Sequence, residues 1–206
     1  MFSPAEQELE RGWPGRIDGD EVIQLAAQTL QAYFTGGGDA REHARYPLQD
    51  VVLRAPVLHP PAIRIFGDDG DFVFANPAAV HGPYDPVVLP EGVDAIEGRL
   101  RLAAVMSAGR EIGGFTLLNE WHAALRGAKA RDFAISLGPV VVTPDELETA
   151  GDWDPLVELV ARNTRLYPGD ILAAGGEPLG PFGAGDVVEV GFDPIGTLRS
   201  SVVARP

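Results

Sequence analysis

The chain contains no cysteine, few basic residues and no long hydrophobic run, and each absence removes a class of protein. Without cysteine, it has no disulfide bond, thiolate nucleophile or zinc–thiolate site. Lysine and arginine total 16 against 30 aspartate and glutamate residues, which gives a formal net charge of -14. Such a charge repels nucleic acid and anionic membranes, so we expect neither as a partner.

Targeting and membrane-spanning patterns are also missing. The first twelve residues, MFSPAEQELERG, are acidic and polar where a signal peptide needs a basic start and an apolar core. No apolar run reaches the length of a membrane span. Hydrophobic residues make up 45% of the 206 residues, enough for one substantial core. We therefore expect a soluble, cytoplasmic protein whose partner is a small molecule or another protein.

Helical patterns are scarce as well. Residues 21–34 place apolar side chains on one face, follow the candidate N-cap Asp20 and precede three glycines, which predicts a helix. A second predicted helix begins at Asp154, with Pro155 at its first position, and ends near Asn163. The other apolar runs are short, rich in β-branched residues and bounded by Gly, Pro or Asp, as strands are. These predicted strands are residues 50–53, 87–89, 137–142, 187–190 and 201–203.

An ordered series of short motifs carries the most specific information. In the C-terminal half the series is Asn119-Glu120, Lys129-x-x-Asp132, Gly138-Pro139, 167–171 (YPGDI), Gly185-Asp186 and 195–198 (IGTL). Upstream it includes 46–51 (YPLQDV), 55–57 (APV), 72–77 (FVFANP) and Gly82-Pro83. The series resembles the fumarylacetoacetate hydrolase family. The resemblance implies a β-rich α+β fold, a mixed β-sandwich roll with few helices, divided into a small N-terminal lobe at residues 1–45 and a β-roll domain at residues 46–206.

The resemblance also implies a chemistry. Members of this family usually dimerise and use Mg²⁺, Mn²⁺ or Ca²⁺ to hold a keto or enol acid during C–C hydrolysis, decarboxylation, tautomerisation or hydration. Hard cations need oxygen ligands, which the family supplies as a Glu-x-Glu pair on one strand and an aspartate on the next. The implied partners are thus a small keto or enol acid and a second subunit, either a copy of this chain or a homologue.

The family's metal-binding positions are altered in this chain. Alignment on Glu97-Gly98 keeps the first glutamate and replaces the second with Arg99, whereas alignment on residues 102–106 replaces the pair with Arg99 and Arg101. Both alignments place arginine where a metal needs a carboxylate. The third ligand position falls at Glu120. We therefore expect no cofactor, and Mg²⁺ or Mn²⁺ only if Glu97 and Glu120 suffice as ligands.

Five residues form the predicted site. Lys129 and Glu120 are predicted to be a catalytic proton-transfer pair, and Arg99, Arg101 and Asp132 to bind the substrate. The arginines would stabilise an enolate in place of the metal. Each role has a structural alternative. Arginines at i and i+2 fit a solvated strand face, Glu120 with Lys129 fits an ion pair without chemistry, and Asp132 fits a residue that orients Lys129 or caps a turn.

Other departures bear on the reaction. The segment between Pro61 and Phe72 is shorter than the corresponding family loop and lacks its water-activating histidine, which argues against hydrolysis. Within it, residues 67–71 (GDDGD) lack the later carboxylates of a calcium loop and are read as a solvated turn. Residues 173–178 (AAGGEP) replace the family's Thr-Gly-Thr-Pro turn and its two hydroxyls. His122 would line the site if its segment is extended, and is otherwise a loop or core histidine.

Three functions remain open. The first, which we favour, is an enzyme with a rebuilt site that acts on a keto, β-keto or enol acid by tautomerisation, decarboxylation or dehydration. The second is a non-catalytic homologue that binds a ligand or serves as a heteromeric partner. The third is a metal-dependent C–C hydrolase that uses Glu97 and Glu120.

Overall fold

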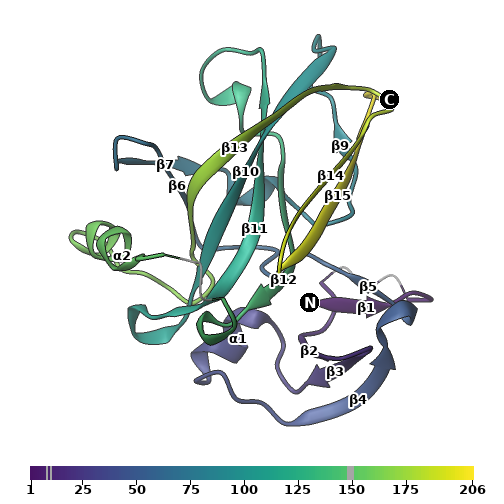
Figure 1. The fold of residues 1–206 in the computed structure, drawn as a ribbon, viewed down its shortest axis with the longest axis vertical. Helices are drawn as coiled ribbons and strands as arrows, with labels where there is room; N and C mark the ends of the chain where they lie inside the picture. Colours follow the sequence, from purple (N-terminus) through teal and green to yellow (C-terminus); the bar gives the residue numbers. More distant parts are fainter. Residues whose placement is uncertain (8, 10, 148–150) are drawn as a thin grey trace.

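The computed structural model describes residues 1–7, 9, 11–147 and 151–206. Seven described strands form a curled mixed sheet in the order β7-β6-β13-β10-β11-β12-β8 (Figure 1). The β12–β8 and β13–β6 pairs run parallel and the other pairs antiparallel. The strands of this sheet are β6 (Ile63–Phe66), β7 (Phe72–Ala75), β8 (Val80–His81), β10 (Ala95–Met106), β11 (Ile112–Ala123), β12 (Ile135–Val142) and β13 (Ile171–Gly183).

A smaller sheet packs on one face of the large one. It consists of β14 (Val187–Phe192), β15 (Gly196–Val203) and β9 (Val87–Val88), in the order β14-β15-β9. At one end, Leu198 of β15 belongs to the same buried cluster as Met106 and Leu117 of the large sheet. At the other end, Val202 packs in a cluster with Trp121. The two sheets thus form a β-sandwich, which confirms the predicted fold class.

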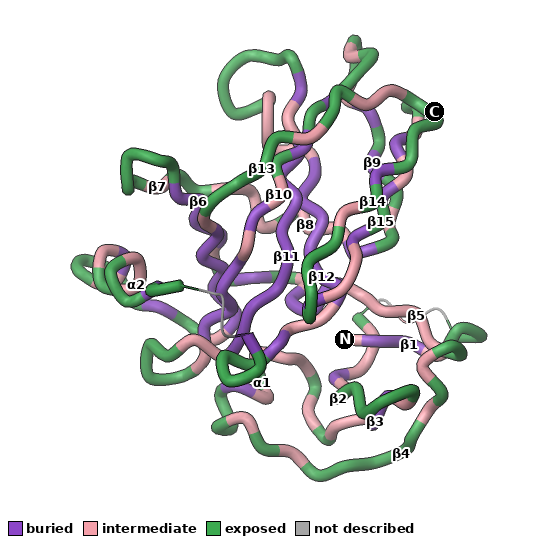
Figure 2. Tube along the Cα trace, viewed as in Figure 1, coloured by how far each residue is buried: buried purple, intermediate pink, exposed green. Residues whose placement is uncertain are grey.

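The opposite face of the large sheet is divided between an apolar half and a polar half. Ala103 of β10 and Leu118 of β11 lie in a buried cluster with Phe34 of the short helix α1 (Leu30–Thr35). Side chains at i and i+2 of a strand share a face, so Arg101 follows Ala103 on this same face. Figure 2 shows that the central strands are buried over much of their length. The polar half therefore begins where the apolar cluster ends.

Short strands near the N-terminus form a separate layer below the sandwich (Figure 1). The rings of Phe2, Trp13 and Tyr46 pack together, with centroids 5.5 to 6.1 Å apart. Strand β4 crosses the predicted boundary between residues 45 and 46, so the division into two units stays a prediction. The strands of this layer are β1 (Phe2–Pro4) paired with β5 (Val51–Leu53), and β2 (Gly15–Asp18), β3 (Glu21–Leu25) and β4 (Glu42–Pro47) in a three-stranded sheet.

The helix predicted over residues 21–34 is wrong in its first half. Residues 21–25 are strand β3, which pairs with β2 and β4, and α1 begins only after the N-cap Thr29. Val22 and Ile23 are adjacent yet both buried, because each face of this small sheet is covered. Asp20 lies in the turn before β3, where its carbonyl oxygen accepts a hydrogen bond from the Leu48 amide. Pairing with two strands outweighed the helical periodicity.

The other secondary-structure predictions are confirmed. Helix α2 (Asp154–Ala161) has Pro155 in its first turn, although Trp153 rather than Asp154 is its N-cap. All five predicted strands lie in or overlap observed strands, namely β5, β9, β12, β14 and β15. Among the described residues, no helix is long and apolar enough to cross a membrane. The 3₁₀ turns are η1 (Leu48–Asp50), η2 (Pro77–Ala79), η3 (Ala108–Arg110), η4 (Gly127–Ala130) and η5 (Pro144–Glu146).

Candidate active site

The register between β10 and β11 places five of the sequence-selected side chains on one face. Arg99 pairs with Glu120 and Glu97 pairs with His122. Directly opposed residues of antiparallel strands project to the same side, as do residues at i and i+2. Arg101 therefore joins the set, and the polar half of the sheet face carries both arginines and Glu120.

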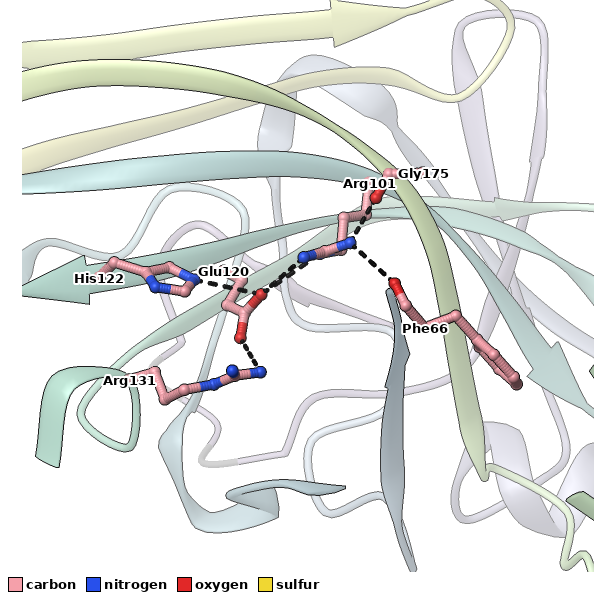
Figure 3. Close-up of polar contacts among 6 residues, drawn as sticks. All are labelled: Phe66, Arg101, Glu120, His122, Arg131 and Gly175. Atoms are coloured by element: carbon pink, nitrogen blue, oxygen red, sulfur yellow. Dashed lines mark hydrogen bonds and ion pairs between the residues drawn. The ribbon is translucent and has the colours of Figure 1, made fainter. Parts of the chain in front are cut away.

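Glu120 is the centre of this cluster and is fully buried. The Arg101 guanidinium, 8% exposed, donates from Nη2 to Glu120 Oε2 at 3.1 Å and from Nε to the same oxygen at 3.3 Å. Its Nη1 donates to the carbonyl oxygens of Phe66, at 3.3 Å, and Gly175 (Figure 3). These four hydrogen bonds fix the Arg101 guanidinium between β6, β11 and β13.

Two further nitrogen groups approach the same carboxylate. Arg131 Nη2 lies 2.8 Å from Glu120 Oε1, and His122 Nε2 lies 3.2 Å from Oε2 (Figure 3). The Arg131 contact is an ion pair, and Glu120 Oε1 accepts no hydrogen bond within the described residues. The Arg131 and His122 side chains are 32% and 33% exposed, which leaves both accessible from solvent.

The charges of the cluster determine its protonation. Burial raises the pKa of Glu120, but the contact with His122 and the charges of Arg131 and Arg101 outweigh it, so the pKa lies below its usual value. Burial lowers the pKa of Arg101, and the charge of Glu120 only partly offsets this. The guanidinium of arginine stays protonated in proteins at neutral pH. The site therefore holds two guanidinium groups, those of Arg101 and Arg131, against one buried carboxylate.

A pocket of about 260 Å³ opens beside the cluster, between the sheet and the β6–β7 hairpin. The buried Arg101 and the half-buried Arg131 contribute to its lining. Its remaining walls are apolar side chains and the hairpin loop, namely Ile65, Phe66, Gly67, Asp69, Asp71, Phe72 and Val73. A small anion that enters would meet guanidinium N–H groups next to apolar surface.

Strand β13 makes room for the arginines by carrying glycines. A Cβ atom on Gly176 would lie 2.7 Å from Arg99 Cγ and 3.2 Å from Arg101 Nη1, and the φ of Gly176 is +148°. Only glycine suits this backbone and this space. The sequence showed the same residues as a turn that had lost two hydroxyls. In the structure, these residues lie against the side chains of Arg99 and Arg101.

The structure places Lys129 and Asp132 together but not against Glu120. Lys129 Nζ lies 2.8 Å from Asp132 Oδ2, and the Lys129 side chain is 78% exposed. The Asp132 carbonyl accepts a hydrogen bond from Asn76 Nδ2 at 2.9 Å. Glu97 and Arg99 are exposed. The contacts of Glu120 are instead with Arg101, Arg131 and His122, and the roles predicted for Lys129 and Asp132 stay predictions.

Sequence reasoning overlooked Arg131 and left His122 undecided. Arg131 is the second variable residue of Lys129-x-x-Asp132, and the motif assigns no role to that position. The signal that could have found it is a basic residue inside a family motif, in a chain with few basic residues. His122 lies on an extended strand, which is the condition that the sequence set for its joining the site.

The metal site implied by the resemblance can be tested against these donors. A hard divalent cation needs several oxygen ligands. Within the described part of the chain, no group of three or more His, Asp or Glu residues could hold a metal ion. Both oxygens of Glu120 face nitrogen donors, and Glu97 has His122 and Arg99 as its neighbours on this sheet face. Metal binding is therefore an alternative to be tested, and the expectation of no cofactor stays a prediction.

Comparison with known proteins bears on the fold. No protein-family model matches the chain. Maleylpyruvate hydrolase from Sphingobium sp. SYK-6, solved with manganese(II) and pyruvate, is similar in structure at a TM-score of 0.81 and 23% identity, over 96% of this chain and 98% of that one. The chain has the fold of the fumarylacetoacetate hydrolase family. The resemblance seen in the sequence is thereby confirmed.

Other proteins of similar structure or sequence are enzymes with different reactions. 5-Carboxymethyl-2-hydroxymuconate delta-isomerase from Mycobacterium smegmatis has a TM-score of 0.76 at 24% identity, over 94% of each chain. A 2-keto-3-deoxy-D-arabinonate dehydratase, complexed with magnesium and 2,5-dioxopentanoate, has a TM-score of 0.78 at 17% identity, over 96% of this chain and 97% of that one. The 2,4-didehydro-3-deoxy-L-rhamnonate hydrolase of Sphingomonas sp. (strain SKA58) is 27% identical over 176 residues, which span 61% of this chain and 62% of that enzyme, less than two thirds of its length.

Proposed function

We propose that this protein is an enzyme that acts on a small keto, β-keto or enol acid, with arginines in place of the metal-binding carboxylates. The observation that carries the proposal is the buried Arg101–Glu120 pair with Arg131 beside it, both arginines lining one pocket. The proteins of similar fold are hydrolases, isomerases and a dehydratase, which supports this general kind of enzyme. Two of them hold a metal with a keto acid, so metal dependence is the alternative to test.

Arg101 and Arg131 would have different roles in this reaction. Four N–H groups of Arg101 are already bonded to Glu120 and to two carbonyl oxygens, which leaves one to interact with a ligand. Arg131 keeps most of its N–H groups free of Glu120, and it lines the pocket. Arg131 would bind the substrate carboxylate, and the fixed charge of Arg101 would stabilise the enolate that forms when a proton or carbon dioxide leaves the adjacent carbon.

Proton transfer needs a side chain that can exchange protons with solvent. Glu120 is fully buried and contacts three nitrogen groups, so its part is to hold Arg101, Arg131 and His122 in place. Lys129 and His122 are the exposed candidates, and Lys129 stays the proposed proton-transfer residue, oriented by Asp132. Pairing of two subunits, alike or homologous, stays a prediction from the resemblance.

The test is the melting temperature of the protein with oxalate, an enolpyruvate mimic, with and without Mg²⁺. A ligand that binds only the folded state raises the apparent stability. We expect stabilisation by oxalate alone, its loss in Arg131→Ala, and its retention in Arg126→Ala, an exposed arginine of the same segment. Lys129→Ala should keep oxalate binding and lose turnover.

Two results would overturn the proposal. Stabilisation only when Mg²⁺ is present would mean that a metal, and not arginine, holds the acid. No stabilisation under either condition would favour the non-catalytic homologue, and co-purification with a family member would then be the next measurement.

A further inference from the structure

The pocket beside Arg101 is lined by charges of both signs. Arg101 is buried and Arg131 is half-buried, whereas Asp69 and Asp71 are exposed. Both aspartates belong to the loop that joins β6 to β7. The chain departs from its family in this loop by being short, and the sequence alone suggested only a solvated turn.

The two carboxylates are held in place by the turn. Asp69 Oδ1 accepts the Asp71 amide at 3.2 Å, and Asp71 Oδ1 accepts the Phe72 amide at 2.8 Å. The Gly67 amide donates to the Asp71 carbonyl at 2.9 Å, which closes the loop. Within the described residues, no side chain or amide contacts the second carboxylate oxygen of either residue. Each aspartate therefore has a free acceptor in the lining of the pocket.

The hairpin that carries the aspartates is held by contacts with Arg64. The Arg64 guanidinium lies 6.0 Å from the ring centroid of Phe72 and 5.3 Å from that of Phe74. Arg64 is itself fixed by a buried ion pair with Asp170, 3.3 Å long. Cation–π contacts from a buried, paired guanidinium restrain the hairpin. The positions of Asp69 and Asp71 relative to Arg101 and Arg131 are thus set by the fold.

We propose that Asp69 and Asp71 select a keto or enol acid whose far end carries hydroxyl or amino groups, and that they reject a second carboxylate there. This inference rests on the proposed function, which places the first carboxylate at Arg131. Hydroxyl and amino groups donate hydrogen bonds to the free aspartate oxygens. A carboxylate at the same place is repelled, which weakens its binding by roughly three- to tenfold for each opposing charge in a partly solvated pocket.

The test compares two acids of equal carbon number by titration calorimetry. 2-Oxoglutarate ends in a carboxylate, and 5-hydroxy-2-oxopentanoate ends in a hydroxyl, while oxalate reports on the arginines alone. We expect the natural protein to bind the hydroxy acid about tenfold or more tightly than 2-oxoglutarate. Asp69→Asn with Asp71→Asn should abolish most of this preference, because asparagine keeps the turn-closing acceptor and loses the charge. Asp68→Asn, in the same loop but outside the pocket lining, is the matched control.

The outcomes separate this inference from the function on which it rests. If oxalate binds but the two longer acids bind equally well, the selectivity is wrong and the acid site stands. The same holds if Asp68→Asn changes the preference as much as the paired substitution does. If neither oxalate nor either keto acid binds, the proposed function fails and the selectivity fails with it.

Discussion

Replacing Glu120 with leucine should destabilise the protein because it leaves a buried guanidinium without its counter-charge. The Arg101 side chain is 8% exposed, and its Nη2 lies 3.1 Å from a carboxylate with no exposed surface. Removal of one partner of a buried ion pair costs about 3–5 kcal/mol. For a chain of this size, that lowers the melting temperature by roughly 6–20 °C. Arg131 and His122 are about one-third exposed and can turn to solvent, so they add little to this loss.

The double substitution Arg101→Met/Glu120→Leu is the informative control. Apolar side chains of similar volume can replace a buried ion pair with little loss, or with a gain, in stability. Urea unfolding followed by tryptophan fluorescence would give all four corners of the cycle, since the chain has three tryptophans. We expect the double variant to lie within about 2 kcal/mol of the natural protein. A loss below about 1 kcal/mol for Glu120→Leu, or simple additivity of the two changes, would refute the reasoning.

The same pair predicts a pH dependence. The pKa of Glu120 is lower in the folded protein than its ordinary value of 4.5, so the unfolded chain binds the proton more readily. Its contribution to stability is therefore complete above pH 4.5 and is lost as the pH falls through the folded-state pKa. The difference in urea midpoint between the natural protein and Glu120→Leu should shrink as the pH falls below that value. A difference that stays constant would mean that the charge of Glu120 does not hold Arg101.

Two further predictions concern matched pairs of sites. Gly176→Ala should weaken stabilisation by oxalate, because the new methyl group meets both site arginines. Gly175 also has a positive φ, of +70°, so alanine there brings backbone strain of the same kind, but its methyl group has nothing within 4 Å and stabilisation by oxalate should be preserved. Asp170→Ala should lower the free energy of unfolding by about 3–5 kcal/mol because Arg64 stays buried, as urea unfolding would show. Glu91→Ala, which breaks an exposed pair with Arg205 of the same 3.3 Å length, should change it by less than about 1 kcal/mol.

The fold could be inferred from the sequence because its signals are local or ordered along the chain. Short β-branched runs between glycines and prolines marked five strands, and Pro155 marked the start of α2. Residues 21–34 show where this approach fails. Val22 and Leu25 fit a helical face as well as a strand, and only pairing with β2 and β4 distinguishes the two.

The candidate site could be inferred from the sequence only in part. The sequence placed Arg99, Arg101 and Glu120 on neighbouring segments, but a shift of one residue would have reversed the faces of both arginines. The observed register, with Arg99 opposite Glu120, decides the matter. Arg131 comes from a turn after β11, and no periodicity in the sequence connects it to Glu120.

The sequence by itself determined the order of the motifs, the net negative charge and the presence of Arg99 and Arg101 on one segment, since these depend on which residues are present and in what order. Tertiary structure decided which charges meet: it buried Glu120, set Arg101 and Arg131 against it, and set Asp69 and Asp71 in the lining of the same pocket as these arginines. Burial is what makes these contacts matter, because a charge that has left water must be compensated by whatever the fold places beside it.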